Sequence, residues 1–186
     1  MVTIASLWLA VVLSAIIVLI ASLIVWAVLP YHKSDYRALP DEKAVREAFS
    51  GQSLPPGQYD IPHLSSREEI QRPEMRLRFQ AEPAGFITII PRGLPSMGKG
   101  VFYSWLYSLS VSAAVAYLAS RTLPADANYL AVFQVTGTVA WLAFGAGGVP
   151  TAIWFGRPWK DVGKQLLDAF IYAILLGGVF GWLWPG

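Results

Sequence analysis

Two histidines in this chain each stand three residues from an aspartate. His32 is followed by Asp35, and Asp60 is followed by His63. Imidazole and carboxylate groups are both metal ligands, so these four side chains are candidates for one metal site. Nothing in their spacing requires the two pairs to meet. The alternative is that they are satisfied polar residues in a packed loop.

The segment 93–100, Gly-Leu-Pro-Ser-Met-Gly-Lys-Gly, resembles a phosphate-binding loop. Gly100 stands where a Ser or Thr hydroxyl would hold magnesium, so the pattern fails at its last position. We interpret it as a loop before a helix, with Lys99 extending toward the membrane surface. The chain has no Cys, no HExxH and no GxSxG. The sequence therefore favours a protein that is not an enzyme and has no cofactor.

The elements that would position these residues are four long apolar stretches. No charged residue or histidine occurs before His32. A bilayer core is crossed by about 20 apolar helical residues. The sequence predicts an all-α membrane protein, one domain over 1–186, with four helices packed as a bundle. The predicted spans are about 5–29, 100–121, 129–150 and 164–184.

The connector 30–99 holds nine of the thirteen prolines, which argues against long helices and central strands. We expect two short helices there. One covers 41–50, and the other starts at Ser65 or Ser66, is interrupted at Pro73 and resumes through Phe79. The apolar run 86–90 is either a strand or a segment lying on the membrane surface.

The basic residues predict the orientation of the chain. Ten Lys or Arg residues lie in 30–99 and three in 157–164, whereas the connection after the second span has only Arg121. The positive-inside rule places 30–99 and 151–163 in the cytoplasm and both termini outside. Five basic residues near the membrane are candidates for contact with lipid headgroups: Arg92, Lys99, Arg157, Lys160 and Lys164. The net charge of +2 and the lack of a dense basic run argue against nucleic acid as a partner.

Small residues recur at every fourth position in the second and fourth spans. Positions i and i+4 share a helix face, and small faces allow helices to approach closely in lipid. These faces either pack within the bundle or contact another protein. The residues are Ser104, Ser108, Ser112, Ala116, Ala169, Ala173, Gly177 and Gly181.

Ionisable groups are scarce within the predicted spans. Asp168 lies one turn into the fourth span, where Lys164 is the residue that would pair with it. No ionisable group falls near a predicted midplane, which argues against an ion-coupled or proton-coupled transporter.

Loop signatures spread over the chain resemble an uncharacterised family of small four-helix bacterial inner-membrane proteins, whose function is unknown. That resemblance implies a bacterial cytoplasmic membrane and four helices, and it implies no activity. The segments that carry it are 29–36, 39–42, 56–59, 62–63, 97–99, 119–123, 126–133, 153–159 and 181–185.

Three functional hypotheses follow from the sequence. The first is a non-catalytic accessory, assembly or scaffold component that binds another membrane protein or itself. The second is a small oligomeric transporter or channel, in which Ser108 and Ser112 would affect solute flux. The third is a membrane enzyme with a metal at His32 and His63.

Overall fold

The computed structural model describes residues 2–185, apart from the side chain of Arg67. Within that range, four helical segments are long and apolar enough to cross a membrane. The chain is a multi-pass membrane protein. It divides into two compact units: one comprises the chain up to Tyr36 and from Pro95 onward, and the other is Arg37–Leu94. The four segments are Ile4–Val28, Met97–Thr122, Tyr129–Phe155 and Trp159–Trp182.

The first span is one continuous helix made of three parts. A 3-10 turn, Ile4–Leu7, is capped by Thr3, whose hydroxyl oxygen accepts from the amide of Ser6 at 3.2 Å. The helix continues as α1, Trp8–Leu23, and closes with a wider π-helical turn, Ile24–Val28. Pro30 then opens a separate 3-10 turn, Pro30–Ser34, because its ring fixes φ and its missing N–H is not needed at a first helical position.

The second and third spans begin at polar caps. Helix α4, Met97–Thr122, is capped by Ser96, and α5, Tyr129–Gly145, is capped by Asn128. The third span does not end at Pro150 as predicted. A 3-10 turn, Ala146–Gly148, leads into α6, Val149–Phe155, because a proline is tolerated in the first turn of a helix.

Helix α7, Trp159–Trp182, begins five residues before the predicted start of the fourth span. Gly156 has a φ of +66° and ends α6, which leaves Pro158 to precede α7 directly. Asp161 lies in the first turn, where a carboxylate is stabilised by the helix dipole. The extra turns place Lys164 and Asp168 inside the helix and not at its start.

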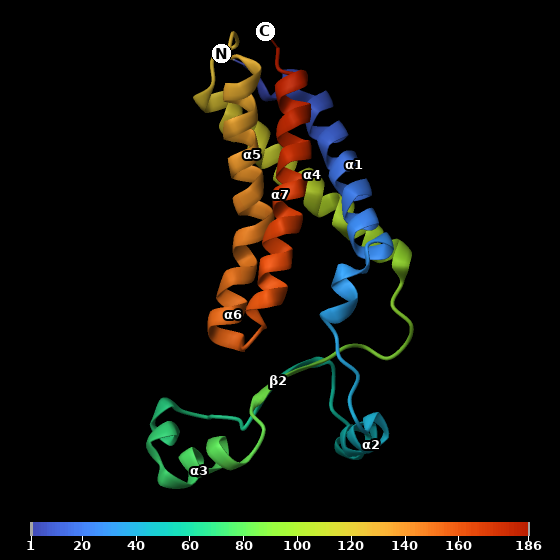
Figure 1. Cartoon of the computed structure of the whole chain (residues 1–186), viewed down its shortest axis with the longest axis vertical. Helices are drawn as coiled ribbons and strands as arrows, with labels where there is room; N and C mark the ends of the chain where they lie inside the picture. The colour runs from blue at the N-terminus through green and yellow to red at the C-terminus, as the bar shows by residue number, and fades with distance from the viewer. Residues whose placement is uncertain (1, 186) are drawn as a thin grey trace. The chain divides into compact units, whose positions relative to one another are not determined.

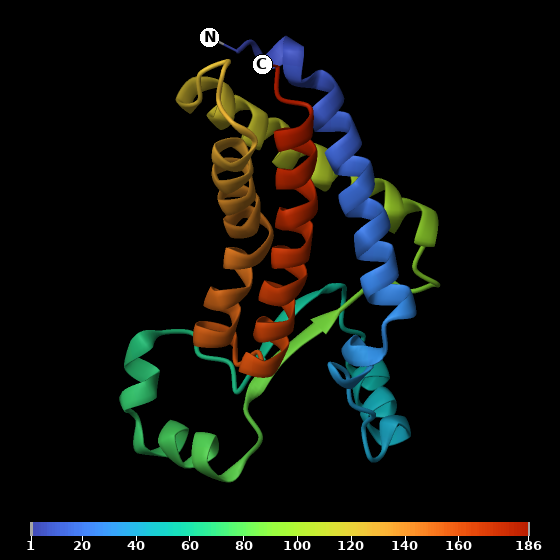
Figure 2. The same cartoon turned by 45° about the horizontal axis from the view of Figure 1, so that its top comes forward.

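Helix α7 lies between α5 and α1 in both views of the chain, and α4 crosses α1 obliquely (Figures 1 and 2). A Cβ on Gly177 would lie 3.1 Å from the Phe133 carbonyl oxygen, and one on Gly181 would lie 2.7 Å from the Tyr129 ring. These two glycines therefore let α7 approach α5 closely. The largest buried apolar side chains of this unit are Phe180, Leu7, Leu176, Val18, Val115 and Val132.

The unit Arg37–Leu94 contains two helices and a two-stranded ribbon. Helix α2, Glu42–Gln52, is capped by Asp41. A 3-10 turn, Arg67–Gln71, precedes α3, Pro73–Ala81. The strands β1, Gly57–Ile61, and β2, Gly85–Ile89, pair antiparallel with Tyr59 opposite Ile87.

Strand β2 covers most of the run 86–90, for which a strand was one of the two alternatives, and a two-stranded ribbon has no central strand. The prolines lie between the strands and outside them, so none interrupts the ladder. The all-α description therefore holds for the spans, and the connector adds this ribbon.

Candidate functional site

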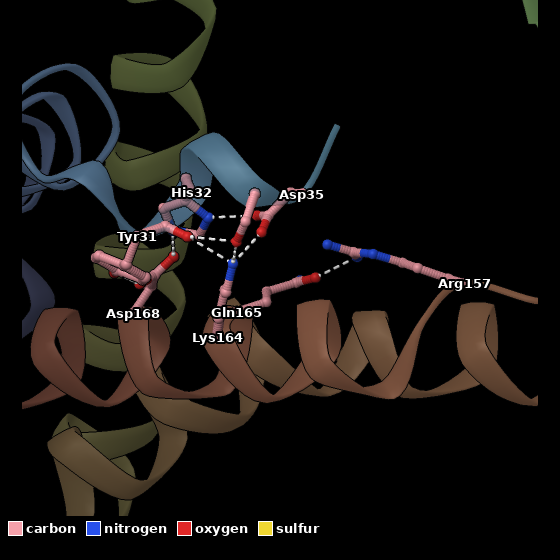
Figure 3. A network of polar contacts seen from close by, with 8 residues as sticks. Tyr31, His32, Asp35, Arg157, Lys164, Gln165 and Asp168 are labelled. Carbon is pink, nitrogen blue, oxygen red and sulfur yellow. Dashed lines mark hydrogen bonds and ion pairs between the residues drawn. The ribbon is translucent and has the colours of Figure 1, made fainter. Parts of the chain in front are cut away.

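Five polar side chains join the end of the first span to α7 (Figure 3). Tyr31, His32 and Asp35 come from the 3-10 turn and the residue after it, and Lys164 and Asp168 come from α7. We call these five residues the polar clasp. All of them belong to the membrane unit.

Local geometry explains why these residues meet. The amide of Asp35 donates to the carbonyl of His32 at 3.0 Å, which closes the turn and sets both side chains on one side of it. Lys164 and Asp168 are four residues apart on α7 and therefore share a helix face. Pro30 fixes the backbone φ where the turn begins.

His32 is the centre of the clasp and is only 6% exposed. Its Nδ1 lies 2.6 Å from Oδ2 of Asp35, and its Nε2 lies 2.9 Å from Oδ2 of Asp168. The ring stacks on the Trp26 indole with centroids 4.0 Å apart and planes 5° from parallel. A carboxylate oxygen can only accept, so either the ring carries both N–H groups or one carboxyl holds the proton.

Lys164 uses all three of its ammonium hydrogens inside the clasp. It donates to the carboxylate of Asp35, to the hydroxyl of Ser34 at 2.9 Å and to the backbone carbonyl of Tyr31 at 2.5 Å. Its side chain is 13% exposed. A lysine has three donors and no acceptor, so this ammonium is fully satisfied by the 3-10 turn.

The clasp changes the acidity of two of its members outside the spans. Hydrogen bonds from His32 and then from Lys164 hold the pKa of Asp35 below its usual value. The pKa of Tyr31 is raised, first by burial and then by the hydrogen bond that its hydroxyl donates to Asp168. Tyr31 therefore remains a neutral donor and Asp35 an anion at neutral pH.

The polar clasp can hold a proton, and it can join the 3-10 turn to α7. Whether the ring or one carboxyl holds the shared proton, the two carboxyl groups, the Lys164 ammonium and the imidazole have no net charge together, which suits a buried site. Removing one proton would leave a buried negative charge. The clasp therefore fastens the chain segment that enters the connector to the first half of α7.

The second histidine forms its own pair in the other unit. Nδ1 of His63 lies 2.7 Å from Oδ1 of Asp60, and both side chains are exposed to solvent. That contact lowers the pKa of Asp60. Among the described residues, no group of three or more His, Cys, Asp or Glu side chains is placed to hold a metal ion. A shared metal at His32, Asp35, Asp60 and His63 stays a prediction that metal analysis of purified protein would test.

Two predictions about Lys164 need correction. It does not pair with Asp168. Lys164 donates to Asp35, and Asp168 is hydrogen bonded to Tyr31 and His32. It also does not point outward to lipid headgroups, since its ammonium is used by the turn.

The other four candidates for headgroup contact divide into two kinds. Arg157 is half-buried and donates to Oε1 of Gln165 at 2.5 Å. The remaining three are exposed, namely Arg92, Lys99 and Lys160. The side chains of these three residues are free to extend to the membrane surface.

Most of the small residues on the spans lie at contacts between helices. On α4, Ser104 is exposed, whereas Ser112 is buried and its hydroxyl accepts from Ser14 of α1 at 3.1 Å. On α7, Gly177 and Gly181 face α5, as the distances above show. The other buried members of the set are Ser108, Ala116, Ala169 and Ala173.

Comparison with known proteins returned no matching family model, no matching curated protein and no matching solved structure. The clasp is therefore interpreted from its own chemistry. The sequence identified His32 with Asp35 and Lys164 with Asp168 as local pairs. It did not indicate that Lys164 contacts Asp35 or that Asp168 contacts His32, and no sequence pattern pointed to Tyr31.

Proposed function

We propose that this chain is a non-catalytic accessory, assembly or scaffold component of a membrane protein complex. Its connector is the part that binds the partner. The observation that carries the proposal is the exposure of large apolar side chains on the unit Arg37–Leu94. Exposed apolar surface on a folded unit is typical of a protein-interaction site.

The two helices of the connector illustrate this exposure. Among the described residues of α2 and α3, none is buried. Leu77 on α3 is 63% exposed, and Ile90 after β2 is 62% exposed. A unit this size that leaves such side chains uncovered gains stability when a partner covers them, at about 25 cal/mol per Å² of apolar surface.

The polar clasp supports the same function from the membrane side. It fixes the turn at which the chain leaves the first span against α7. A segment that is already ordered loses less conformational entropy when a partner binds it.

The setting that we propose is the bacterial cytoplasmic membrane, with residues 30–99 in the cytoplasm and both termini outside. The distribution of basic residues supports this orientation. The resemblance to small bacterial inner-membrane proteins supports a location in the bacterial cytoplasmic membrane.

A purification from native membranes tests the proposal. The tagged full-length chain is isolated in mild detergent, and the proteins that accompany it are identified by mass spectrometry. We expect a stoichiometric membrane protein that is largely lost in Leu77→Glu and retained in Gln80→Glu, which adds a charge at an exposed position of the same helix. A homo-oligomer without a partner, or equal recovery from both variants, would contradict the proposal.

The transport hypothesis has less support. Of its two proposed path-lining residues, Ser112 is fully buried and hydrogen bonded to Ser14. A hydroxyl used to join two helices is not free to contact a solute. Solute flux in proteoliposomes remains the measurement that would restore this hypothesis.

A further inference from the structure

A cleft of about 340 Å³ opens between the spanning helices on the same side as the polar clasp. All four spans contribute to it. Its walls include Ser22 and Trp26 from the first span, Ser104 and Tyr107 from α4, Phe144 from α5 and Tyr172 from α7.

Tyr172 is the unusual member of this lining. The residue is 8% exposed, and its hydroxyl has no hydrogen-bond partner of good geometry among the described residues. Trp26 is its polar neighbour, but an indole N–H can only donate. The hydrogen of the Tyr172 hydroxyl therefore has no acceptor. A buried donor without an acceptor is costly, by about 1–3 kcal/mol.

No other polar group among the described residues that line the cleft, Ser104 and Ser108 included, is placed to accept a hydrogen bond from the Tyr172 hydroxyl. The Tyr107 hydroxyl donates to the carbonyl of Ala143 at 3.0 Å, and the Ser22 hydroxyl donates to the carbonyl of Leu19 at 2.8 Å. Asp168 lies one turn before Tyr172, but its two oxygens are hydrogen bonded to Tyr31 and His32. Among the described residues, the hydrogen of the Tyr172 hydroxyl therefore has no acceptor within reach.

The nature of the missing acceptor follows from the lining. None of the nine described residues around the cleft carries a charge, so the cleft has no cation to select a phosphate. Leu23, Trp26 and Tyr107 are each more than a third exposed, so the cleft opens to the side, where a spanning chain meets hydrocarbon. A molecule that enters from the hydrocarbon is an amphiphile. Because the lining is uncharged, the group that accepts from Tyr172 should be an uncharged oxygen attached to an apolar chain.

We propose that the cleft binds a membrane amphiphile through a carbonyl oxygen that accepts from the Tyr172 hydroxyl. The chain of the amphiphile lies along Val18 and Phe144, and its polar end lies toward Trp26 and the polar clasp. The ester carbonyl of a glycerolipid and the ring carbonyl of an isoprenoid quinone share this chemistry.

Lipids with and without the carbonyl group test the proposal. Purified full-length protein is given diacyl and dialkyl phosphatidylglycerol of equal chain length in competition, and bound lipid is measured by native mass spectrometry. We expect the diacyl lipid to be retained about fivefold over the dialkyl lipid, because one neutral hydrogen bond is worth about 1 kcal/mol. Equal retention by the wild-type protein would overturn the proposal without any variant.

Two tyrosine variants locate the preference. Tyr172→Phe removes one oxygen and should abolish the preference for the diacyl lipid. Tyr107→Phe is the matched control in the same cleft, and it should keep the preference because that hydroxyl already has an acceptor in the chain. A preference that survives in Tyr172→Phe would overturn the proposal.

A third arm identifies the source of the carbonyl. Ubiquinone is added to the diacyl competition at equal mole fraction. Displacement of the lipid that depends on Tyr172 supports the proposal and assigns the carbonyl to a quinone. Retention of the lipid assigns it to the glycerolipid ester.

Discussion

Nε2 of His32 lies 2.9 Å from Oδ2 of Asp168, although 136 residues separate them in the chain. The same imidazole contacts Asp35 through Nδ1, so one ring joins the end of the first span to α7. The contact with Asp168 is buried and the contact with Asp35 is half-buried. A buried charged group that loses its partner is strongly destabilising. The consequences of this arrangement can be measured one residue at a time.

Replacing His32 with Phe should lower the thermal stability of the detergent-solubilised protein. The ring can still stack on Trp26, but Asp35 and Asp168 lose a shared donor, which costs about 3 kcal/mol or more. His63→Phe is the control, because His63 makes the same kind of pair with Asp60 at an exposed position. Equal shifts in melting temperature for the two variants would show that burial of the pair has no effect.

Lys164 and Lys160 provide a second matched pair. Lys164→Met removes three hydrogen bonds to the 3-10 turn and leaves Asp35 with the imidazole alone, at a cost of about 1.5–3 kcal/mol. Lys160→Met changes an exposed lysine one turn earlier and should have little effect on unfolding. Unfolding monitored by tryptophan fluorescence should separate them, and similar midpoints would contradict the assignment of Lys164 to the clasp.

The contribution of Tyr31 to stability should be lost at alkaline pH. Its pKa in the folded chain is raised above the usual 10.0. A raised pKa means that the stabilisation is complete below pH 10 and declines as the pH rises beyond it. The difference in melting temperature between wild type and Tyr31→Phe should therefore shrink from pH 10 upward. A difference that stays constant from pH 7 to pH 11 would contradict this linkage.

The glycines of α7 should differ in their tolerance of alanine. Gly181→Ala places a Cβ 2.7 Å from the Tyr129 ring, and overpacking of this kind costs about 1–3 kcal/mol. Gly178→Ala places its Cβ 3.6 Å from the Tyr129 hydroxyl, which is ordinary contact, and should be neutral. Melting temperatures in detergent would test both, and a neutral Gly181→Ala would show that α5 and α7 separate easily.

The proposed orientation can be tested with single cysteines, because the chain has none of its own. A membrane-impermeant thiol reagent applied to intact cells should label Ala125→Cys and leave Gln80→Cys unlabelled until the cells are opened. Both positions are exposed in the structure. The reverse pattern would place the connector outside the cytoplasm.

The spans could be predicted from the sequence because hydropathy is a local property. Twenty apolar residues in a row have few alternatives to crossing a bilayer, and Pro30 marks the end of the first span without reference to the rest of the chain. The boundaries near Pro150 and Trp159 were predicted wrongly. A proline is tolerated in the first turn of a helix and ends a helix elsewhere, so the effect of Pro150 depends on where α6 begins. The start of α7 at Trp159 likewise depends on where the preceding loop ends.

The candidate site was only half visible in the sequence. Turn spacing brings His32 and Asp35 together, so a local rule identifies that pair, whereas the helical spacing of Lys164 and Asp168 predicts a pair that does not form. The contacts of Lys164 with Asp35 and of Asp168 with His32 depend on the turn Pro30–Ser34 lying against α7. The unpaired Tyr172 hydroxyl depends on how four helices surround it. The sequence by itself determined a membrane protein and the pair of His32 with Asp35. The tertiary structure decided which charges neutralise each other and which donor is left without an acceptor, because both depend on distances between segments far apart in the chain.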